Sequence, residues 1–105
     1  MQVISFPGVQ EFIKSLEGKT RGKVFSLIEL LEILGLSKRP PESKKIAENL
    51  YELRTSGRSK VRIFYTVKNG RAFLLSTFVK KSWKLPPQEI QKAKNRIDAL
   101  ARYSR

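Results

Sequence analysis

Apolar and polar residues follow two different periods at the start of the chain. Residues 2–6 alternate weakly between polar and apolar side chains, which predicts a short strand ended by Pro7-Gly8. After that strand, apolar residues recur at the i, i+3, i+4 and i+7 positions of one helix face, which are Val9, Phe12, Ile13 and Leu16. This spacing predicts a first helix, and Gly18 is expected to end it.

A second helical stripe follows after a short link. Its main positions are Val24, Leu27, Leu31 and Leu34. Thr20 is expected to cap this helix at its start, and Gly35 is expected to end it. Because the link is short, we expect two antiparallel helices, a helical hairpin whose apolar face needs a sheet to cover it.

Three further strands are predicted in the middle of the chain. Residues 37–43, with Pro40-Pro41 among them, are expected to form a loop. Residues 50–55, 60–67 and 71–79 then have the composition of strands. Between the last two of these, Asn69-Gly70 predicts a two-residue hairpin turn.

The predicted turn sets an expected register for the strands on either side of it. Arg62 is expected opposite Thr77 and Phe64 opposite Leu75, with Thr66 and Phe73 paired on the same face. The other face is expected to pair Val61, Ile63, Tyr65 and Val67 with Phe78, Ser76, Leu74 and Ala72. This second face is the more continuously apolar, so we expect the helical hairpin to cover it and leave Arg62 on the opposite face.

A last helix completes the predicted domain. Pro86-Pro87 opens it, where a missing amide proton costs nothing, and its apolar stripe consists of Ile90, Ala93, Ile97, Leu100 and Ala101. A chain of 105 residues has the usual size of one domain. We therefore predict a single α+β domain over residues 1–105, with a small antiparallel sheet, an N-terminal helical hairpin on one face and a C-terminal helix.

The positive charge of the chain is concentrated in one region. The chain has 22 Lys and Arg against nine Asp and Glu, a formal net charge of +13. Residues 1–52 are nearly neutral, whereas residues 53–88 contain nine cations and no Asp or Glu. With no acid in that stretch of sequence to neutralise them, these cations are available to a polyanion such as a nucleic-acid backbone.

Two residue types are missing from the composition. The chain has no cysteine and no histidine, which excludes disulfides, thiolate nucleophiles, imidazole metal ligands and the commonest general base. We expect no metal and no cofactor. No apolar segment is long enough to span a bilayer, and the first residues do not resemble a signal peptide, so a cytoplasmic location is expected.

Predicted strand pairing gathers cations from distant parts of the sequence. Pairing of residues 60–67 with 71–79 is expected to bring Lys80 and Lys81 close to Lys60. Cleavage of an RNA backbone by its own 2′-hydroxyl requires that the negative charge developing around phosphorus be stabilised. A planar guanidinium binds two phosphoryl oxygens at once, so Arg54 and Arg62 are the candidates for this catalytic role.

Proton transfer in such a reaction has to proceed without histidine. Neighbouring positive charges disfavour the protonated form of a lysine, so one of Lys80, Lys81 or Lys84 is expected to exchange protons with the RNA. Alternatively, the cationic site mainly orients the RNA and stabilises the transition state, while protons pass through water or ribosomal RNA. Arg58 and Lys60 are expected to bind RNA.

Several of these side chains also have purely structural explanations. Arg54 can form an ion pair with Glu52 or Glu48. Trp83 either stacks on a base or closes the edge of the core. The cations that flank the predicted turn, at positions 68 and 71, are expected to be ordinary solvated charges.

Four segments in a fixed order carry a resemblance to a known family. They are Leu50-Tyr51-Glu52-Leu53-Arg54, Val61-Arg62-Ile63-Phe64-Tyr65, Phe78-Val79-Lys80-Lys81 and Lys84-Leu85-Pro86. Together they resemble the RelE/ParE toxin superfamily, and within it the HigB-like branch of phage-derived toxins. The resemblance runs from about residue 50 to residue 96. It implies a RelE-like fold, ribosome-dependent cleavage of messenger RNA, growth arrest, and neutralisation by a helix-turn-helix antitoxin.

Two alternatives to this function remain open on the sequence. ParE-type toxins of the same superfamily inhibit DNA gyrase by binding it, and a basic domain can bind RNA without cleaving it. Because one fold serves several functions, the fold does not separate these alternatives. The Arg54/Arg62 and Lys80-Lys81 pattern favours the nuclease, since inhibition of gyrase does not require clustered phosphate ligands.

Overall fold

The computed structural model describes residues 1–34, 42–55 and 60–103 of the chain. Within these residues the elements are β1 (Gln2–Ser5), α1 (Val9–Ser15), α2 (Gly18–Leu34), β2 (Ser43–Ala47), β3 (Leu50–Arg54), β4 (Val61–Lys68), β5 (Arg71–Val79) and α3 (Pro87–Tyr103). The predicted α+β class is confirmed. The expected end of the second helix at Gly35 and most of the expected 37–43 loop lie outside the described residues.

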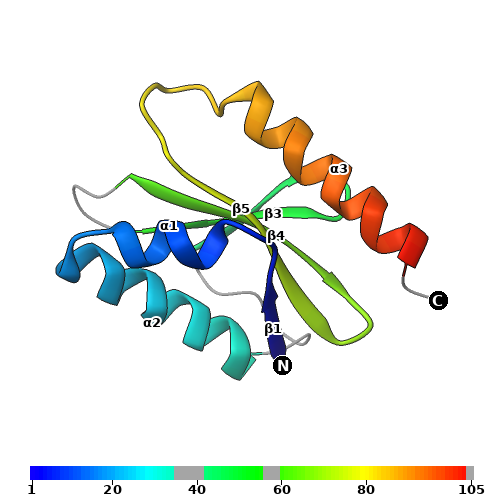
Figure 1. The fold of residues 1–105 in the computed structure, drawn as a ribbon, viewed down its shortest axis with the longest axis horizontal. Helices are drawn as coiled ribbons and strands as arrows, with labels where there is room; N and C mark the ends of the chain where they lie inside the picture. The colour runs from blue at the N-terminus through cyan, green and yellow to red at the C-terminus, as the bar shows by residue number, and fades with distance from the viewer. Residues whose placement is uncertain (35–41, 56–59, 104–105) are drawn as a thin grey trace.

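One five-stranded sheet forms the middle layer of the molecule, with helices on both sides (Figure 1). Its strand order is β1-β5-β4-β3-β2. Neighbouring strands are antiparallel except at one edge, where β1 runs parallel to β5. The prediction of an antiparallel sheet is therefore wrong at this edge. β1 and β5 are far apart in sequence, so no hairpin joins them and makes them antiparallel.

The helical hairpin α1–α2 covers one face of the sheet, as expected. Ile13 of α1 and Leu31 of α2 are fully buried there, in one cluster with Ile63, Tyr65 and Leu74 of the sheet. The helix α3 covers the opposite face, where the buried residues are Leu50, Phe64, Phe73, Leu75, Phe78 and Ala93. Both faces of the sheet are therefore covered by apolar layers.

The Asn69-Gly70 turn has the predicted form. Both residues have positive φ, 53° and 75°, and Lys68 pairs with Arg71 across the turn. This is the geometry of a type I′ hairpin, in which asparagine and glycine are preferred because they tolerate left-handed backbone conformations.

The predicted register holds only for the half of the hairpin near the turn. Tyr65 pairs with Leu74 as expected, but a β-bulge follows, so that Arg62 lies opposite Phe78 and not Thr77. The bulge turns Phe78 onto the α3 face, and the expectation that it faces the helical hairpin is wrong. A bulge leaves backbone groups unpaired, and Arg96 of α3 donates a hydrogen bond to the carbonyl of Leu75 at this point.

The strand β2 was not predicted from the sequence. It lies at the sheet edge and pairs antiparallel with β3, and its Lys44 and Lys45 are exposed. Edge strands commonly carry charged residues, which prevent pairing with other molecules but also remove the apolar alternation typical of a strand. Ser43, expected in the preceding loop, is the first residue of β2.

The start of α2 also differs from the prediction. The helix begins at Gly18, which was expected to end the previous helix, and its capping side chain is Glu17 and not Thr20. The Glu17 carboxylate accepts hydrogen bonds from the Thr20 amide at 2.8 Å and from the Thr20 hydroxyl at 2.7 Å. These hydrogen bonds, that from the hydroxyl first, lower the pKa of Glu17.

Candidate functional site

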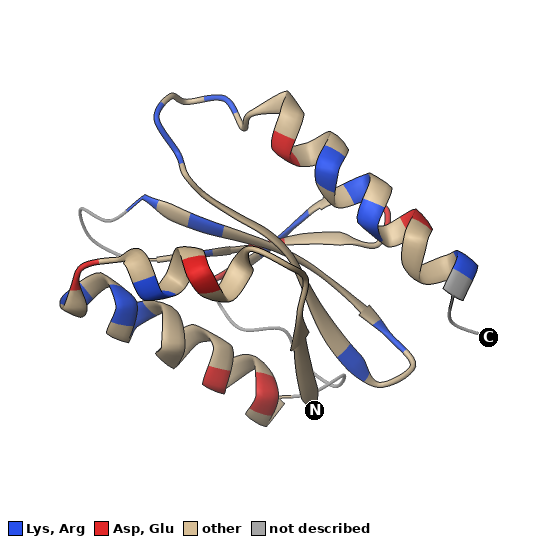
Figure 2. Ribbon diagram, viewed as in Figure 1, with Lys and Arg blue, Asp and Glu red and all other residues tan. Residues whose placement is uncertain are grey.

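An open pocket of about 380 Å³ lies where β4 begins and β5 ends. Its lining consists of Lys60, Arg62, Lys80, Lys81, Ser82 and Trp83. The backbone amide of Lys80 donates a 2.7 Å hydrogen bond to the carbonyl of Lys60, which fixes the segment after β5 against the start of β4. Figure 2 shows the basic positions at the start of β4 and along the segment that leads to α3.

The strand pairing brings together most of the cations predicted to form a site. The expected closeness of Lys80 to Lys60 is confirmed by their backbone hydrogen bond, and Arg62, Lys81 and Trp83 line the same pocket. Arg54 and Lys84 are not among its described lining residues. Arg58 lies outside the described residues. The catalytic and RNA-binding roles of these side chains remain predictions.

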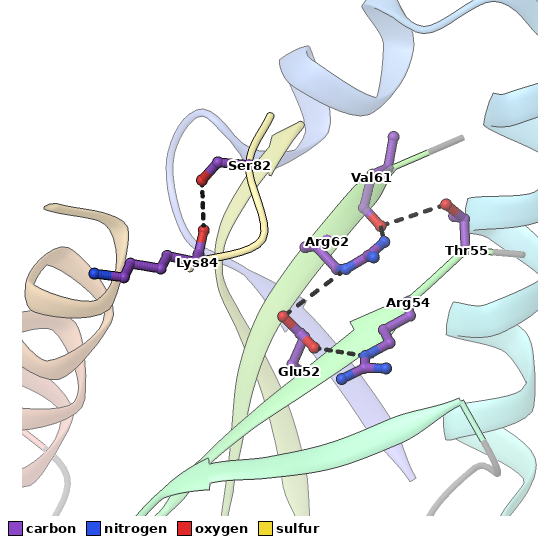
Figure 3. A network of polar contacts seen from close by, with 7 residues as sticks. All are labelled: Glu52, Arg54, Thr55, Val61, Arg62, Ser82 and Lys84. Carbon is purple, nitrogen blue, oxygen red and sulfur yellow. Dashed lines mark hydrogen bonds and ion pairs between the residues drawn. The ribbon is translucent and has the colours of Figure 1, made fainter. Parts of the chain in front are cut away.

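Arg54 is held next to the pocket by its strand pairing. It lies directly opposite Arg62 across β3 and β4, and both side chains approach the carboxylate of Glu52 (Figure 3). Nε of Arg54 donates a 2.8 Å hydrogen bond to Glu52 Oε1. Nε of Arg62 lies 3.9 Å from Glu52 Oε2, while its Nη1 donates a 3.1 Å hydrogen bond to the carbonyl of Val61.

Glu52 supplies an acid to two cations of the acid-free stretch of sequence, so the expectation that all of these cations are free for a polyanion is wrong for Arg54 and Arg62. The residue precedes the acid-free segment in sequence, but the pairing of β3 with β4 carries its side chain between the two arginines. The structural alternative for Arg54, an ion pair with Glu52, is confirmed, whereas Glu48 pairs with Lys45. The i, i+2 spacing of Glu52 and Arg54 is the sequence signal for their ion pair, since residues i and i+2 of a strand share one face.

The buried carboxylate offsets an unfavourable arrangement of charges. Two like charges directly opposite each other on neighbouring strands repel. The Glu52 side chain is only 1% exposed, that of Arg62 is 13% exposed and that of Arg54 is 44% exposed. Glu52 neutralises one of the two arginines, and the lysines at positions 60, 80 and 81 add their positive charges to the same end of the sheet.

Trp83 stands at the rim of the pocket and does not close the core. The side chain is a large apolar group left 82% exposed. The ammonium of Lys84 lies 5.0 Å from the centre of its ring, and Ser82 donates a hydrogen bond to the Lys84 carbonyl (Figure 3). An exposed indole flanked by cations is a suitable surface on which an unpaired base can stack.

The remaining basic candidates differ in their surroundings. Arg71 is exposed beside the hairpin turn, as expected. Lys68 is half-buried, and its ammonium donates a hydrogen bond of 3.3 Å to the carbonyl of Leu100 in α3, so its role is partly structural. Within the described ranges no three His, Cys, Asp or Glu side chains are grouped as metal ligands. None of the helices described is long and apolar enough to cross a membrane.

The fold and the pocket define a small α+β domain with a cationic site at one end of its sheet. The sequence model of the phage-derived Gp49-like proteins (DUF891) matches residues 11–98, so the chain belongs to this family. The Gp49-like proteins are a family of RelE/HigB-like toxins, which confirms the resemblance at the level of the family. No curated protein matches the chain.

Proposed function

We propose that this protein is the toxin of a toxin–antitoxin pair and that it is a ribosome-dependent endoribonuclease acting on messenger RNA. Gp49-like proteins are commonly toxins of such pairs, which supports the first half of the proposal. The second half rests on one observation, the pocket that gathers Arg62 and three lysines beside an exposed tryptophan. Its described lining contains no carboxylate, so a sugar-phosphate chain would meet cations, a serine hydroxyl and an aromatic surface.

The proposed reaction is attack by a ribose 2′-hydroxyl on the adjacent phosphorus. The O2′–P bond forms and the P–O5′ bond breaks, which leaves a 2′,3′-cyclic phosphate and a free 5′-hydroxyl. One proton leaves O2′ and one is delivered to O5′, so the reaction is balanced without another reactant. Negative charge accumulates on the non-bridging oxygens, and the guanidinium of Arg62, assisted by Arg54, stabilises it.

The proton transfers are assigned to the lysines of the segment after β5. Lys80 and Lys81 line the pocket and are the better candidates, because the Lys84 ammonium lies over the Trp83 ring. One of these lysines is proposed to accept the O2′ proton and another to donate a proton to O5′. Lys60 is proposed to bind the RNA backbone beside the reacting phosphate, and Arg58, which lies outside the described residues, to bind RNA as well.

The proposed partner is a helix-turn-helix antitoxin with an acidic segment. A negatively charged segment placed over the pocket neutralises its lysines and excludes RNA from them. Co-expression with the antitoxin is expected to restore growth, and a complex that leaves Arg54 and Arg62 accessible would contradict occlusion of the site.

A matched pair of arginine variants tests the nuclease proposal. Arg62→Lys keeps the charge but removes the planar fork, and is expected to lower cleavage of ribosome-bound messenger RNA by roughly 100-fold. Arg71→Lys, at the exposed turn, is expected to cleave like the wild type. Intact messages together with DNA breaks in arrested cells would instead support a gyrase inhibitor, and RNA binding without cleavage would support a binding module.

A further inference from the structure

Glu52 is the most deeply buried charged side chain near the pocket, and its contacts are incomplete. One carboxylate oxygen accepts the Arg54 hydrogen bond, but the other, Oε2, has no hydrogen-bond partner among the described residues. The same is true of Arg62 Nε, 3.9 Å away. The two unpartnered atoms face each other, so attraction between charges and not a formed hydrogen bond connects them.

The two arginines differ in how much they depend on this carboxylate. Arg54 is nearly half exposed, so water can solvate its guanidinium if the carboxylate is lost. Arg62 is largely buried and has Arg54 directly opposite it. Without a negative charge between them, the Arg62 guanidinium would be repelled from its position with little solvent to stabilise it there.

We propose that Glu52 is a positioning residue, whose buried carboxylate holds the Arg62 guanidinium at the wall of the cationic pocket where a phosphodiester binds. Its consequence for RNA cleavage rests on the proposed nuclease function. The hydrogen bond from Arg62 Nη1 to the Val61 carbonyl fixes a second point of the same guanidinium. The hydrogen bond at Nη1 and the attraction of Nε toward the Glu52 carboxylate together restrict the orientation of the guanidinium. A planar fork binds phosphate only in a defined orientation.

The effect of Glu52→Gln on RNA cleavage separates positioning from simple electrostatics, because only positioning predicts a loss of cleavage. Removal of one negative charge makes the site more cationic, so electrostatics alone predicts tighter RNA binding and cleavage that is unchanged or faster. Positioning predicts a loss of kcat of roughly 10- to 100-fold, because a small displacement of a catalytic group costs that much. Tighter binding with undiminished kcat, per folded molecule, would overturn the proposal.

A double-substitution cycle then tests whether Glu52 acts through Arg62. If it does, Glu52→Gln causes little further loss in an Arg62→Lys background, because the positioned group has already been changed. In a Lys81→Ala background, which alters the same pocket but no contact of Glu52, the full loss is expected. An equal loss in both backgrounds would show that Glu52 acts independently of Arg62, and would contradict the proposal.

A conservative variant and a spectroscopic measurement cover the case in which Glu52→Gln folds poorly. Glu52→Asp keeps the charge and is expected to retain more cleavage than Glu52→Gln. In wild-type protein the Nε proton of Arg62 is expected to exchange with water more slowly than the Nε proton of exposed Arg71. The same difference between the two arginines is expected in Glu52→Asp but not in Glu52→Gln. Equal exchange at the two arginines of the wild type would overturn the positioning role.

The same measurements distinguish failure of this inference from failure of the proposed function. If wild-type protein cleaves no RNA on ribosomes, the nuclease proposal fails, whereas the arginine resonances still decide whether Glu52 holds Arg62. If the wild type cleaves RNA but Glu52→Gln cleaves equally well, the nuclease proposal stands and the positioning role is wrong.

Discussion

Arg54 and Arg62 lie directly opposite each other on β3 and β4 and share one buried carboxylate, that of Glu52. The arrangement keeps two guanidinium groups side by side although they repel each other. A carboxylate with so little exposure is itself costly to bury unless cations compensate it. Each arginine is therefore stabilised by the carboxylate, and the carboxylate by both arginines, so removal of Glu52 has the largest effect.

We expect Glu52→Ala to lower the free energy of unfolding by roughly 2–3 kcal/mol, less than for a fully buried pair because Arg54 can be solvated. Glu48→Ala is the matched control, since Glu48 forms an exposed ion pair with Lys45 at 3.5 Å. That substitution is expected to change stability by less than about 0.5 kcal/mol. Urea unfolding measures both, and equal effects would contradict the importance of burial.

Two neighbouring apolar residues of α2 provide a test of the core. Leu31 is 1% exposed and packs in the cluster between α2 and the sheet, whereas Ile33 is 72% exposed. Leu31→Ala is expected to cost about 2–5 kcal/mol, because it leaves a cavity against the sheet. Ile33→Ala is expected to stay within about 0.5 kcal/mol of the wild type. Thermal unfolding of both variants checks this, and a large loss for Ile33→Ala would show that its face of α2 is covered.

Two glycines are expected to respond to alanine in opposite directions. At both Gly70 and Gly22 an added Cβ meets no atom within 4 Å, so only the backbone conformation matters. Gly70 has a φ of +75°, and Gly70→Ala is expected to destabilise the protein by about 1 kcal/mol. Gly22 lies inside α2, and Gly22→Ala is expected to stabilise by up to about 1 kcal/mol. Denaturant midpoints of the two variants should move apart.

Trp83 is the only tryptophan of the chain, so its fluorescence reports directly on the rim of the pocket. If a base stacks on it, single-stranded RNA is expected to quench the emission. Trp83→Ala is then expected to weaken RNA binding by about 1–3 kcal/mol and leave the melting temperature unchanged, since the ring is exposed. Unaltered fluorescence at saturating RNA would exclude stacking.

The pocket lysines are expected to determine how RNA binding depends on salt. Each phosphate contact on single-stranded RNA contributes about 0.7 to the slope of log affinity against log salt concentration. Lys81→Ala is expected to reduce the slope by about that amount. Lys44→Ala, on the exposed edge strand β2, is the control and should leave the slope unchanged. Equal slopes for wild type and Lys81→Ala would remove Lys81 from the RNA contacts.

Local patterns predicted the elements of this fold better than their relations in space. The Asn69-Gly70 turn and the strands on either side of it follow from residues close in sequence. The β-bulge does not, because it depends on the burial of Phe78 against α3 and on the hydrogen bond from Arg96 to the Leu75 carbonyl. The lysine-rich strand β2 was missed for a similar reason, since its partner β3 and not its own pattern makes it a strand.

For the candidate site too, contacts within one hairpin were predictable and contacts between other strands were not. The closeness of Lys80 to Lys60 was predictable, because a two-residue turn brings the far ends of its two strands together and the β-bulge shifts their pairing by only one residue. The ion pair of Glu52 with Arg54 was predictable from the sequence, but the closeness of Glu52 to Arg62 was not, because Glu52 precedes the acid-free segment. Its place between Arg54 and Arg62 depends on the pairing of β3 with β4, a contact that no local pattern specified.

The parallel pairing of β1 with β5 bears on the order in which the domain assembles. Gln2 is paired with Arg71, so β1 has its partner in β5, a strand that is synthesised well after it. A nascent chain therefore carries β1 unpaired until β5 has been made, and one edge of the hairpin stays open until β1 docks. Because contacts between residues far apart in sequence form slowly, we expect this closure to be a late step of folding.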